Sequence, residues 1–319
     1  MKRFNSILLV GAPEGDPTPE LAQAVALAHQ HQAHLTILDV ITTNPIGTLY
    51  PEAARAEVID ALVSRHWSRW EAAIAPYRAS TPITIEIRVG VRFIEVIRAV
   101  LAQQHDLVIK TAEAPDWMQR LFGSDDMHLL RKCPCPVWIL SPWLRQPAPI
   151  LVAAVDVSLA ADDPEPTGLN RQIVQLASTL AQQHGWELHL LHVVEIDDNP
   201  FWPHIPSLPQ ALSSDQLFGL HQQRVSDLVS AVNGLRMRQG EPAITPVIHL
   251  PVGSARQTLP QCLRELDAQL IVMGTVARTG LPGFIIGNTA ESTLEQLACS
   301  VLALKPPGFV SPVQPAHLP

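Results

Sequence analysis

The chain has 319 residues, of which 47% are apolar and 16% are charged, and this composition indicates a globular protein of about two domains. Its net charge of -8 argues against nonspecific binding to nucleic acid or to an anionic membrane surface. No apolar run approaches the roughly 20 residues that a membrane-spanning helix requires. We therefore expect a cytoplasmic protein whose partners include neither nucleic acid nor membrane.

The first half of the sequence alternates between short apolar runs and segments with helical periodicity. Within the predicted helix 52–77, one apolar face is expected to contain His66, Trp67 and Trp70. The order of elements predicts a parallel sheet with helices on both faces. Strands are expected at 6–12, 35–41, 83–89, 107–109 and 136–140, and the clearest helices at 52–77 and 93–104.

The same pattern then begins again after a proline-rich linker. Residues 28–40 match residues 181–193, and the dipeptide 89–90 matches 252–253. Further matches join 123–124 to 287–288 and 135–137 to 299–301. The sequence therefore predicts one α/β fold used twice. We expect two tandem doubly wound domains, 1–144 and 145–319, each with a five-stranded, mostly parallel sheet flanked by helices.

One stretch of the second repeat, residues 270–291, resembles an anion site. An apolar strand leads into a loop that contains four glycines, and Asn288 or Thr289 can cap a helix that begins near Ala290. Glycines allow a ligand to approach the backbone, and the free N–H groups of a helix start attract anions. The local sequence fits a simple helix cap behind a flexible loop equally well.

Asp156 follows the first strand of the second repeat. In an open α/β sheet, ligands bind beyond the carboxyl ends of the strands, where a carboxylate can accept a hydrogen bond from an amine or a hydroxyl. The alternative is an aspartate that only begins a turn.

Catalytic and metal-binding patterns are scarce. The sequence contains no Gly-x-Ser-x-Gly, no Gly-x-x-x-x-Gly-Lys-Ser/Thr and no His-Glu-x-x-His motif, so no catalytic residue is predicted. Cys133 and Cys135 have no second pair of suitable spacing, which favours buried structural thiols over a zinc site. His29, His31 and His34 are expected at a solvated helix end, and no metal is predicted.

Several of these features together resemble the universal stress protein family. They are the tandem repeat, Val155-Asp156, the segment 191–194, and Gly274-x-x-Ala277 followed, after nine intervening residues, by Gly287-Asn288. The resemblance covers essentially the whole chain. It implies a Rossmann-like fold, and it implies that ATP, if it binds, lies across the strand ends of the second domain. The residues implied to bind it are Ala154, Asp156, Val193, Met273, Gly274, Ala277, Arg278, Gly287, Asn288 and Thr289.

The chain departs from the pattern of the ATP-binding members at two positions. Ala277 replaces the second glycine of Gly-x-x-Gly, and Asn288 replaces a serine or threonine. The first domain has departed further, because Lys110 and Glu113 stand where its loop glycines belong and Pro13 aligns with Asp156. ATP is therefore expected in the second domain only.

The resemblance implies a stress-response protein that senses a ligand, and not an enzyme, with slow ATP hydrolysis as the only activity considered. The first domain is expected to pack against the second as an intramolecular pseudo-dimer. A homodimer and unknown protein partners remain open. Two alternatives also remain open: a nucleotide-free scaffold, and a binder of a different apolar ligand that the insert 199–212 covers.

Overall fold

A computed structural model of the chain describes residues 4–12, 17–42, 51–112, 125–141, 149–157, 168–195, 213–275, 294, 296, 297 and 299–315. These residues form two compact units. The first unit contains the described residues 4–141, together with Thr275 and residues 300–315, and the second contains the described residues from 149 to 274 and from 294 to 299.

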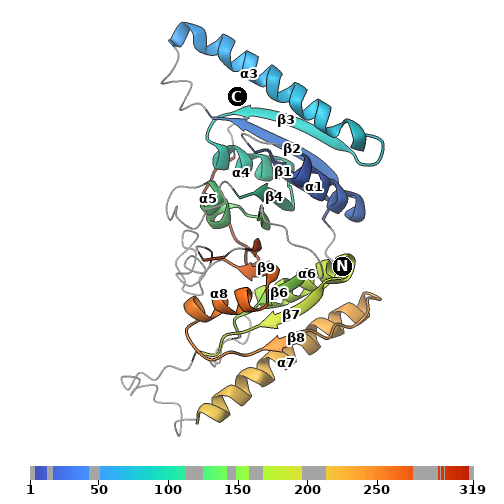
Figure 1. Cartoon of the computed structure of the whole chain (residues 1–319), viewed down its shortest axis with the longest axis vertical. Coiled ribbons are helices and arrows are strands. Elements are labelled where there is room, and N and C mark those ends of the chain that lie inside the picture. Colours follow the sequence, from blue (N-terminus) through green and yellow to red (C-terminus); the bar gives the residue numbers. More distant parts are fainter. Residues whose placement is uncertain are drawn as a thin grey trace. The chain divides into compact units, whose positions relative to one another are not determined.

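The first unit is built on a mostly parallel sheet with strand order β3-β2-β1-β4-β5-β10. Its strands β3, β2, β1 and β4 are labelled in Figure 1. Only β10 runs antiparallel to its neighbour β5. Helices cover the sheet, so its central strands are apolar along almost their whole length. The strands are β1 (Ser6–Val10), β2 (His34–Ile41), β3 (Ile83–Val89), β4 (Leu107–Thr111), β5 (Val137–Leu140) and β10 (Ser300–Leu304).

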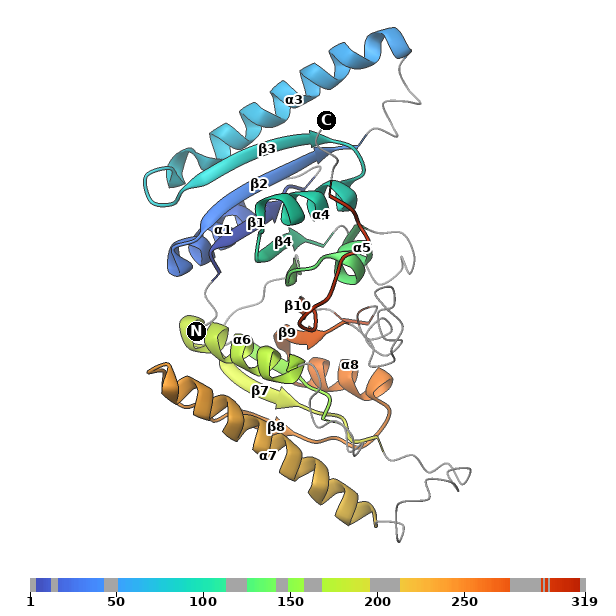
Figure 2. The same cartoon turned by 180° about the vertical axis from the view of Figure 1, so that it is seen from behind.

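The helices of the first unit lie close to the predicted ranges. They are α1 (Thr18–His31), α3 (Glu52–Ile74) with the short 3-10 turn Ala75–Tyr77, α4 (Arg92–Gln103) and α5 (Asp125–Lys132). Helix α3 runs along the edge strand β3 in both views (Figures 1 and 2). The predicted apolar face of α3 is wrong in one position: Trp70 is fully buried, but the side chain of Trp67 is 45% exposed.

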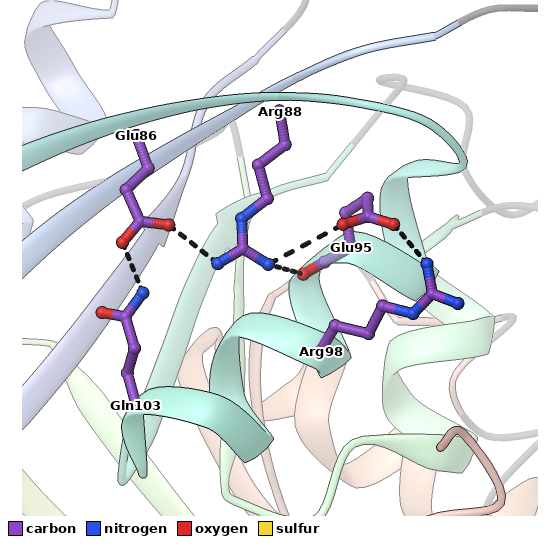
Figure 3. Close-up of polar contacts among 5 residues, drawn as sticks. All are labelled: Glu86, Arg88, Glu95, Arg98 and Gln103. Atoms are coloured by element: carbon purple, nitrogen blue, oxygen red, sulfur yellow. Dashed lines mark hydrogen bonds and ion pairs between the residues drawn. The ribbon is translucent and has the colours of Figure 1, made fainter. Parts of the chain in front are cut away.

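A polar network joins the edge strand β3 to helix α4 (Figure 3). Arg88 donates to the carboxylate of Glu86 at 2.9 Å and to the backbone carbonyl of Glu95 at 3.4 Å. Arg98 donates to the Glu95 carboxylate at 2.7 Å, and Gln103 donates to Glu86. Glu86 and Arg88 are two residues apart and therefore share one face of the strand. This face contacts α4 through charged side chains, which explains the polar positions in the otherwise apolar strand.

The second unit contains a parallel sheet with strand order β9-β6-β7-β8. Its helix α7 begins with a capping box, in which Ser213 and Gln216 exchange side-chain and backbone hydrogen bonds. The strands are β6 (Ile150–Ala154), β7 (Glu187–Leu191), β8 (Val247–His249) and β9 (Ala268–Gly274), and the helices are α6 (Leu169–His184), α7 (Ser214–Arg238) and α8 (Ala255–Glu265).

The two units have the same strand topology. Each places the strands of its half in the order third, second, first and fourth, which gives β3-β2-β1-β4 in the first unit and β8-β7-β6-β9 in the second. The predicted α/β fold with a mostly parallel sheet is therefore confirmed. The repeat also extends to single registers: Ser6 pairs with His34 in β2, and Ile150 pairs with Glu187 in β7. The last strand, β10, belongs with the first unit. The predicted boundary between residues 144 and 145 stays a prediction.

Candidate functional site

The predicted ligand residues of the second unit lie at the carboxyl ends of its parallel strands. Asp156, just beyond β6, is exposed. Ala154, Val193 and Gly274 are half-exposed at the ends of β6, β7 and β9, whereas Met273 is buried. Because all four strands are parallel, their carboxyl ends lie along one edge of the sheet, the position where open α/β sheets bind ligands. We call this group of five residues the strand-end site.

Asn170, near the start of α6, holds the backbone of Asp156. The Asp156 N–H donates to Asn170 Oδ1 at 3.2 Å, and Asn170 Nδ2 donates to the carbonyl oxygen of Asp156 at 2.8 Å. One amide side chain thus satisfies both backbone groups of the residue. The position of Asp156 relative to α6 is therefore set by two hydrogen bonds, while its side chain stays exposed to solvent.

A pair of histidines lies beside Asp156. His192 Nδ1 donates to the carbonyl oxygen of Val155 at 3.2 Å, so the neutral ring must accept at Nε2. His221 Nδ1, from α7, lies 2.8 Å from that Nε2, and the two rings stack with centroids 4.8 Å apart. Burial lowers the pKa of His221, and the Asp156 carboxylate acts in the opposite direction. Two imidazole rings that share one hydrogen bond therefore support the end of β7.

Gly274 has a packing role as well as a place in the strand-end site. A Cβ atom at this position would lie 2.7 Å from Cδ2 of Leu169 and 3.9 Å from Cδ1 of Ile173. The missing side chain thus allows α6 to pack closely against the end of β9. A glycine here does not by itself indicate a ligand, and Asp156 is the more informative residue.

Other predicted residues lie outside the described part of the chain. These are Ala277, Arg278, Gly287, Asn288 and Thr289, together with the insert 199–212. Their roles remain predictions.

The corresponding strand ends of the first unit are filled by its own side chains. Trp70 from α3 is fully buried, and a Cβ atom added to Gly11 would lie 2.7 Å from its Cζ2. The indole Nε1 and His66 Nδ1 both donate to Asp39 Oδ2, each at 2.8 Å. Arg69 donates to the carbonyl of Ala12 at 3.4 Å. Thus α3 covers the ends of both β1 and β2.

The paired registers also correct the alignment of the two halves. Val10 pairs with Leu38 in β2 as Ala154 pairs with Leu191 in β7, so Ala12 corresponds to Asp156. The sequence alignment had assigned Pro13, one residue later and outside the described residues. Either assignment leaves the first unit without a carboxylate at this position.

A buried ion pair closes the end of β4. Lys110 Nζ lies 2.6 Å from Asp126 Oδ1, and both side chains are less than 5% exposed. Arg92 lies 3.6 Å from the neighbouring Asp125. Asp125 and Asp126 form the first turn of α5, where a bound anion would otherwise be favoured, so these carboxylates take its place.

The alignment of the two halves is also wrong by one position at Lys110, which it matched to Gly274. Leu9 pairs with Ile109 in β4, and its counterpart Ala153 pairs with Val272 in β9. Lys110 therefore corresponds to Met273, and Thr111 corresponds to Gly274. The predicted loss of the glycine is confirmed, since threonine occupies that position. Glu113 lies outside the described residues.

The described part of the chain contains no group of three or more His, Cys, Asp or Glu side chains that could hold a metal ion. None of its described helices is long and apolar enough to cross a membrane. Of the predicted histidine cluster, His29 is exposed, whereas His31 is buried against Phe4 with ring centroids 5.1 Å apart. The solvated-end prediction is thus wrong for His31.

Sequence reasoning did not identify Asn170, His192 or His221 as part of this region. The repeat contained a clue, because Asp39 and His192 align in the matched segments 28–40 and 181–193. His66 and His221 then follow on the next long helix of each half. A polar residue at or near the end of the second strand, paired with a histidine from that helix, is therefore common to both units.

The sequence comparisons agree with the repeated fold. The model of the Universal stress protein family matches residues 7–141 and 159–305. Universal stress protein E of Salmonella typhi is 31% identical over 326 aligned residues, which cover 98% of each chain. Universal stress protein E of Photorhabdus laumondii is 28% identical and covers 99% of each chain.

Two solved structures share the fold over nearly the whole chain. One is a protein of unknown function from Pseudomonas aeruginosa PAO1, 24% identical, with a TM-score of 0.61 and coverage of 95% of this chain and 93% of that one. The other is a universal stress protein from Archaeoglobus fulgidus, 17% identical, with a TM-score of 0.60 and coverage of 95% and 97%. Both likenesses concern the fold alone. Because the family model matches both halves, the chain belongs to the universal stress protein family.

Proposed function

We propose that the chain is a cytoplasmic stress-response protein whose second half binds a nucleotide, ATP first of all, at the strand-end site. The observation that carries the proposal is the contrast between the two halves. In the second half an exposed carboxylate, Asp156, stands among the half-exposed positions Ala154, Val193 and Gly274. In the first half the equivalent strand ends are filled by Trp70 and by the Lys110–Asp126 ion pair.

The chemistry of the strand-end site suits the base and sugar of a nucleotide. The Asp156 carboxylate can accept hydrogen bonds from an exocyclic amine or a ribose hydroxyl. Alanine and valine at the neighbouring strand ends offer small apolar side chains against which a flat ring could pack. The phosphates would reach Ala277, Arg278, Gly287, Asn288 and Thr289, as the family pattern implies. Arg278 would then supply the positive charge that compensates for the two departures from that pattern.

The first half serves a structural purpose in this proposal. The acidic first turn of α5 would repel a phosphate, and Trp70 fills the space over Gly11. The chain thus uses two repeats where a single-domain relative would use two subunits, and we expect it to behave as a pseudo-dimer. Sedimentation equilibrium would test this, because a monomeric mass is expected and a stable dimer would contradict it.

The proposed activity is binding and not catalysis. The histidines nearest Asp156 hydrogen-bond to each other and to the backbone, which is the arrangement of a support and not of a general base. The relatives of similar length are universal stress proteins by name, which supports the role in stress response.

Calorimetric titration of ATP and ADP into the full chain tests the proposal directly. Ligand at 100 times Kd should stabilise the folded state by about 2.7 kcal/mol and raise the melting temperature. Asp156→Ala should remove most of the heat of binding. Asp227→Ala is the matched control, because Asp227 is an exposed aspartate on α7 outside the strand-end site. Binding that Asp156→Ala leaves unchanged would place the ligand elsewhere. No heat and no change in melting temperature would favour the scaffold instead.

A further inference from the structure

Two thiols lie in contact between α5 and β5. Cys133 Sγ is 3.7 Å from Cys135 Sγ, and both residues are buried. Pro134, which lies between them, is half-exposed, as is Pro136. The pair therefore lies directly beneath two partly exposed residues, and Cys135 itself is 9% exposed.

A buried lysine accompanies the thiols. Lys305, directly after β10, is 7% exposed, and its Nζ donates to the carbonyl of Leu130 and to Thr275 Oγ1. Thr275 Oγ1 also donates to the Leu130 carbonyl at 3.2 Å. Leu130 belongs to the last turns of α5, just before Cys133. The ammonium group thus lies at the C-terminal end of α5, where the negative end of the helix dipole would otherwise disfavour a thiolate.

The electrostatics distinguish the two sulfur atoms. Burial raises the pKa of Cys133, but hydrogen bonds from Cys135 and the charge of Lys305 outweigh it, and the pKa falls below its ordinary value. The same contact with Cys133, together with burial, raises the pKa of Cys135. Burial also lowers the pKa of Lys305, to about 7. We therefore assign Cys133 as the nucleophile of the pair, because the charge of Lys305 favours its thiolate.

We propose that Cys133 and Cys135 form a reversible dithiol that a hydroperoxide oxidises to a disulfide. This inference rests on the contact between the thiols and on their lysine partner, and it is independent of nucleotide binding. It replaces the purely structural role that the sequence suggested for the two cysteines, although their predicted burial is confirmed.

The reaction balances in two steps. The Cys133 thiolate attacks one oxygen of hydrogen peroxide, so an S–O bond forms, the O–O bond breaks, and the hydroxide released takes a proton to become water. Cys135 then loses its proton and attacks the Cys133 sulfur, which forms the S–S bond and releases the second oxygen as water. Two thiols are oxidised and one peroxide is reduced to two waters.

Only a small movement is required to close the bond. The sulfur atoms must approach from 3.7 Å to the bonded distance of about 2.05 Å. Pro134 lies in a bend between α5 and β5, so the adjustment can be made by the two side chains and this bend. A bridge across one intervening residue closes a tight ring, so thiol reductants should reopen it readily.

The remaining cysteines provide internal controls. Burial raises the pKa of Cys262, and burial raises that of Cys299 to about 12. Both thiols should therefore stay protonated and react more slowly. The variant that replaces both, Cys262→Ser/Cys299→Ser, retains the proposed pair alone.

The test treats the full chain with hydrogen peroxide, blocks free thiols with iodoacetamide in denaturant, and maps tryptic peptides by mass spectrometry. Cleavage after Lys132 and Arg145 yields one peptide, 133–145, that contains both cysteines. We expect this peptide to lose the mass of two hydrogen atoms, to escape alkylation, and to recover both properties after dithiothreitol. The Cys262→Ser/Cys299→Ser variant should react at the same rate.

Lys305→Met tests the contribution of the ammonium group. Oxidation of the pair should slow about tenfold for each pKa unit by which the Cys133 thiolate is destabilised. An unchanged thermal melt would show that the variant is folded. If it does not fold, the peptide map of the natural chain still decides the proposal. The proposal is overturned if peptide 133–145 stays reduced while Cys262 is oxidised, if the two thiols become separate sulfinic acids, or if either pairs with another cysteine.

Discussion

The indole ring of Trp70 lies so close to Gly11 that a Cβ atom on that glycine would be 2.7 Å from Cζ2. The ring is fully buried, and its Nε1–H is committed to the Asp39 carboxylate. Gly11 follows β1 at the place where the second unit has Val155, next to the exposed Asp156. This single contact therefore accounts for much of the difference between the described strand ends of the two units.

Gly11→Ala should destabilise the first unit by about 1–3 kcal/mol, because the new methyl group meets a rigid ring that cannot withdraw. Urea unfolding followed by tryptophan fluorescence would measure the change. Gly219→Ala is the control, since Gly219 lies within α7 and a Cβ there would meet nothing within 4 Å. Alanine should stabilise that helix by about 0.5–1 kcal/mol. Equal stability of both variants would show that the Trp70 ring can move aside.

Lys110→Met should cost about 3–5 kcal/mol of folding stability, because it leaves the buried Asp126 carboxylate without its lysine partner. The double variant Lys110→Met/Asp126→Leu should recover most of this loss, since neither charge then remains buried. Chemical denaturation of the natural chain, both single variants and the double variant forms a complete cycle. Strictly additive effects would mean that the ion pair is not a coupled unit.

Asn170→Ala should weaken nucleotide binding about tenfold, because it frees the backbone of Asp156 and so costs roughly 1.4 kcal/mol of pre-organisation. Asn233→Ala is a matched control. Its amide also bridges a backbone N–H and a carbonyl of one residue, Ile244, at 2.8 and 3.1 Å. Thermal melting should show that both variants are destabilised, whereas calorimetry should show weaker binding only for Asn170→Ala. Equal affinities would exclude a role for the Asp156 backbone in the site.

Folding stability should fall as the pH drops below about 6.5. Burial lowers the pKa of His105, His128, His184, His221 and His249 below the ordinary value of 6.5. At a pH between the lowered pKa values of the folded chain and the ordinary pKa of 6.5, the unfolded chain binds more protons than the folded chain. Acid therefore favours unfolding. Urea midpoints measured between about pH 7.5 and 5 should decrease, and His221→Gln should reduce the slope. A flat profile would contradict the neutral state assigned to these rings.

Much of the fold follows from the sequence because it depends on local patterns. The apolar runs at 6–12 and 150–155 and the matched segments 28–40 and 181–193 predict buried parallel strands used twice. Position in the sequence was likewise enough to predict which residues lie at strand ends: Asp156, Ala154, Val193 and Gly274. Periodicity was less reliable at the margin of a helix face, where it wrongly predicted that Trp67 is buried. The alignment of the two halves was also wrong by one residue at Pro13 and at Lys110.

Only the tertiary structure shows that the strand ends of the first unit are filled by its own side chains. Trp70 covers Gly11, and Asp126 neutralises Lys110, across separations of 59 and 16 residues that no local pattern encodes. The contact between His192 and His221 and the place of Lys305 beside Cys133 are equally non-local. Periodicity shows which residues turn inward, but the partner of each depends on how helices pack over strand ends. Whether a strand end is filled or open is therefore a property of packing, and only the folded chain determines it.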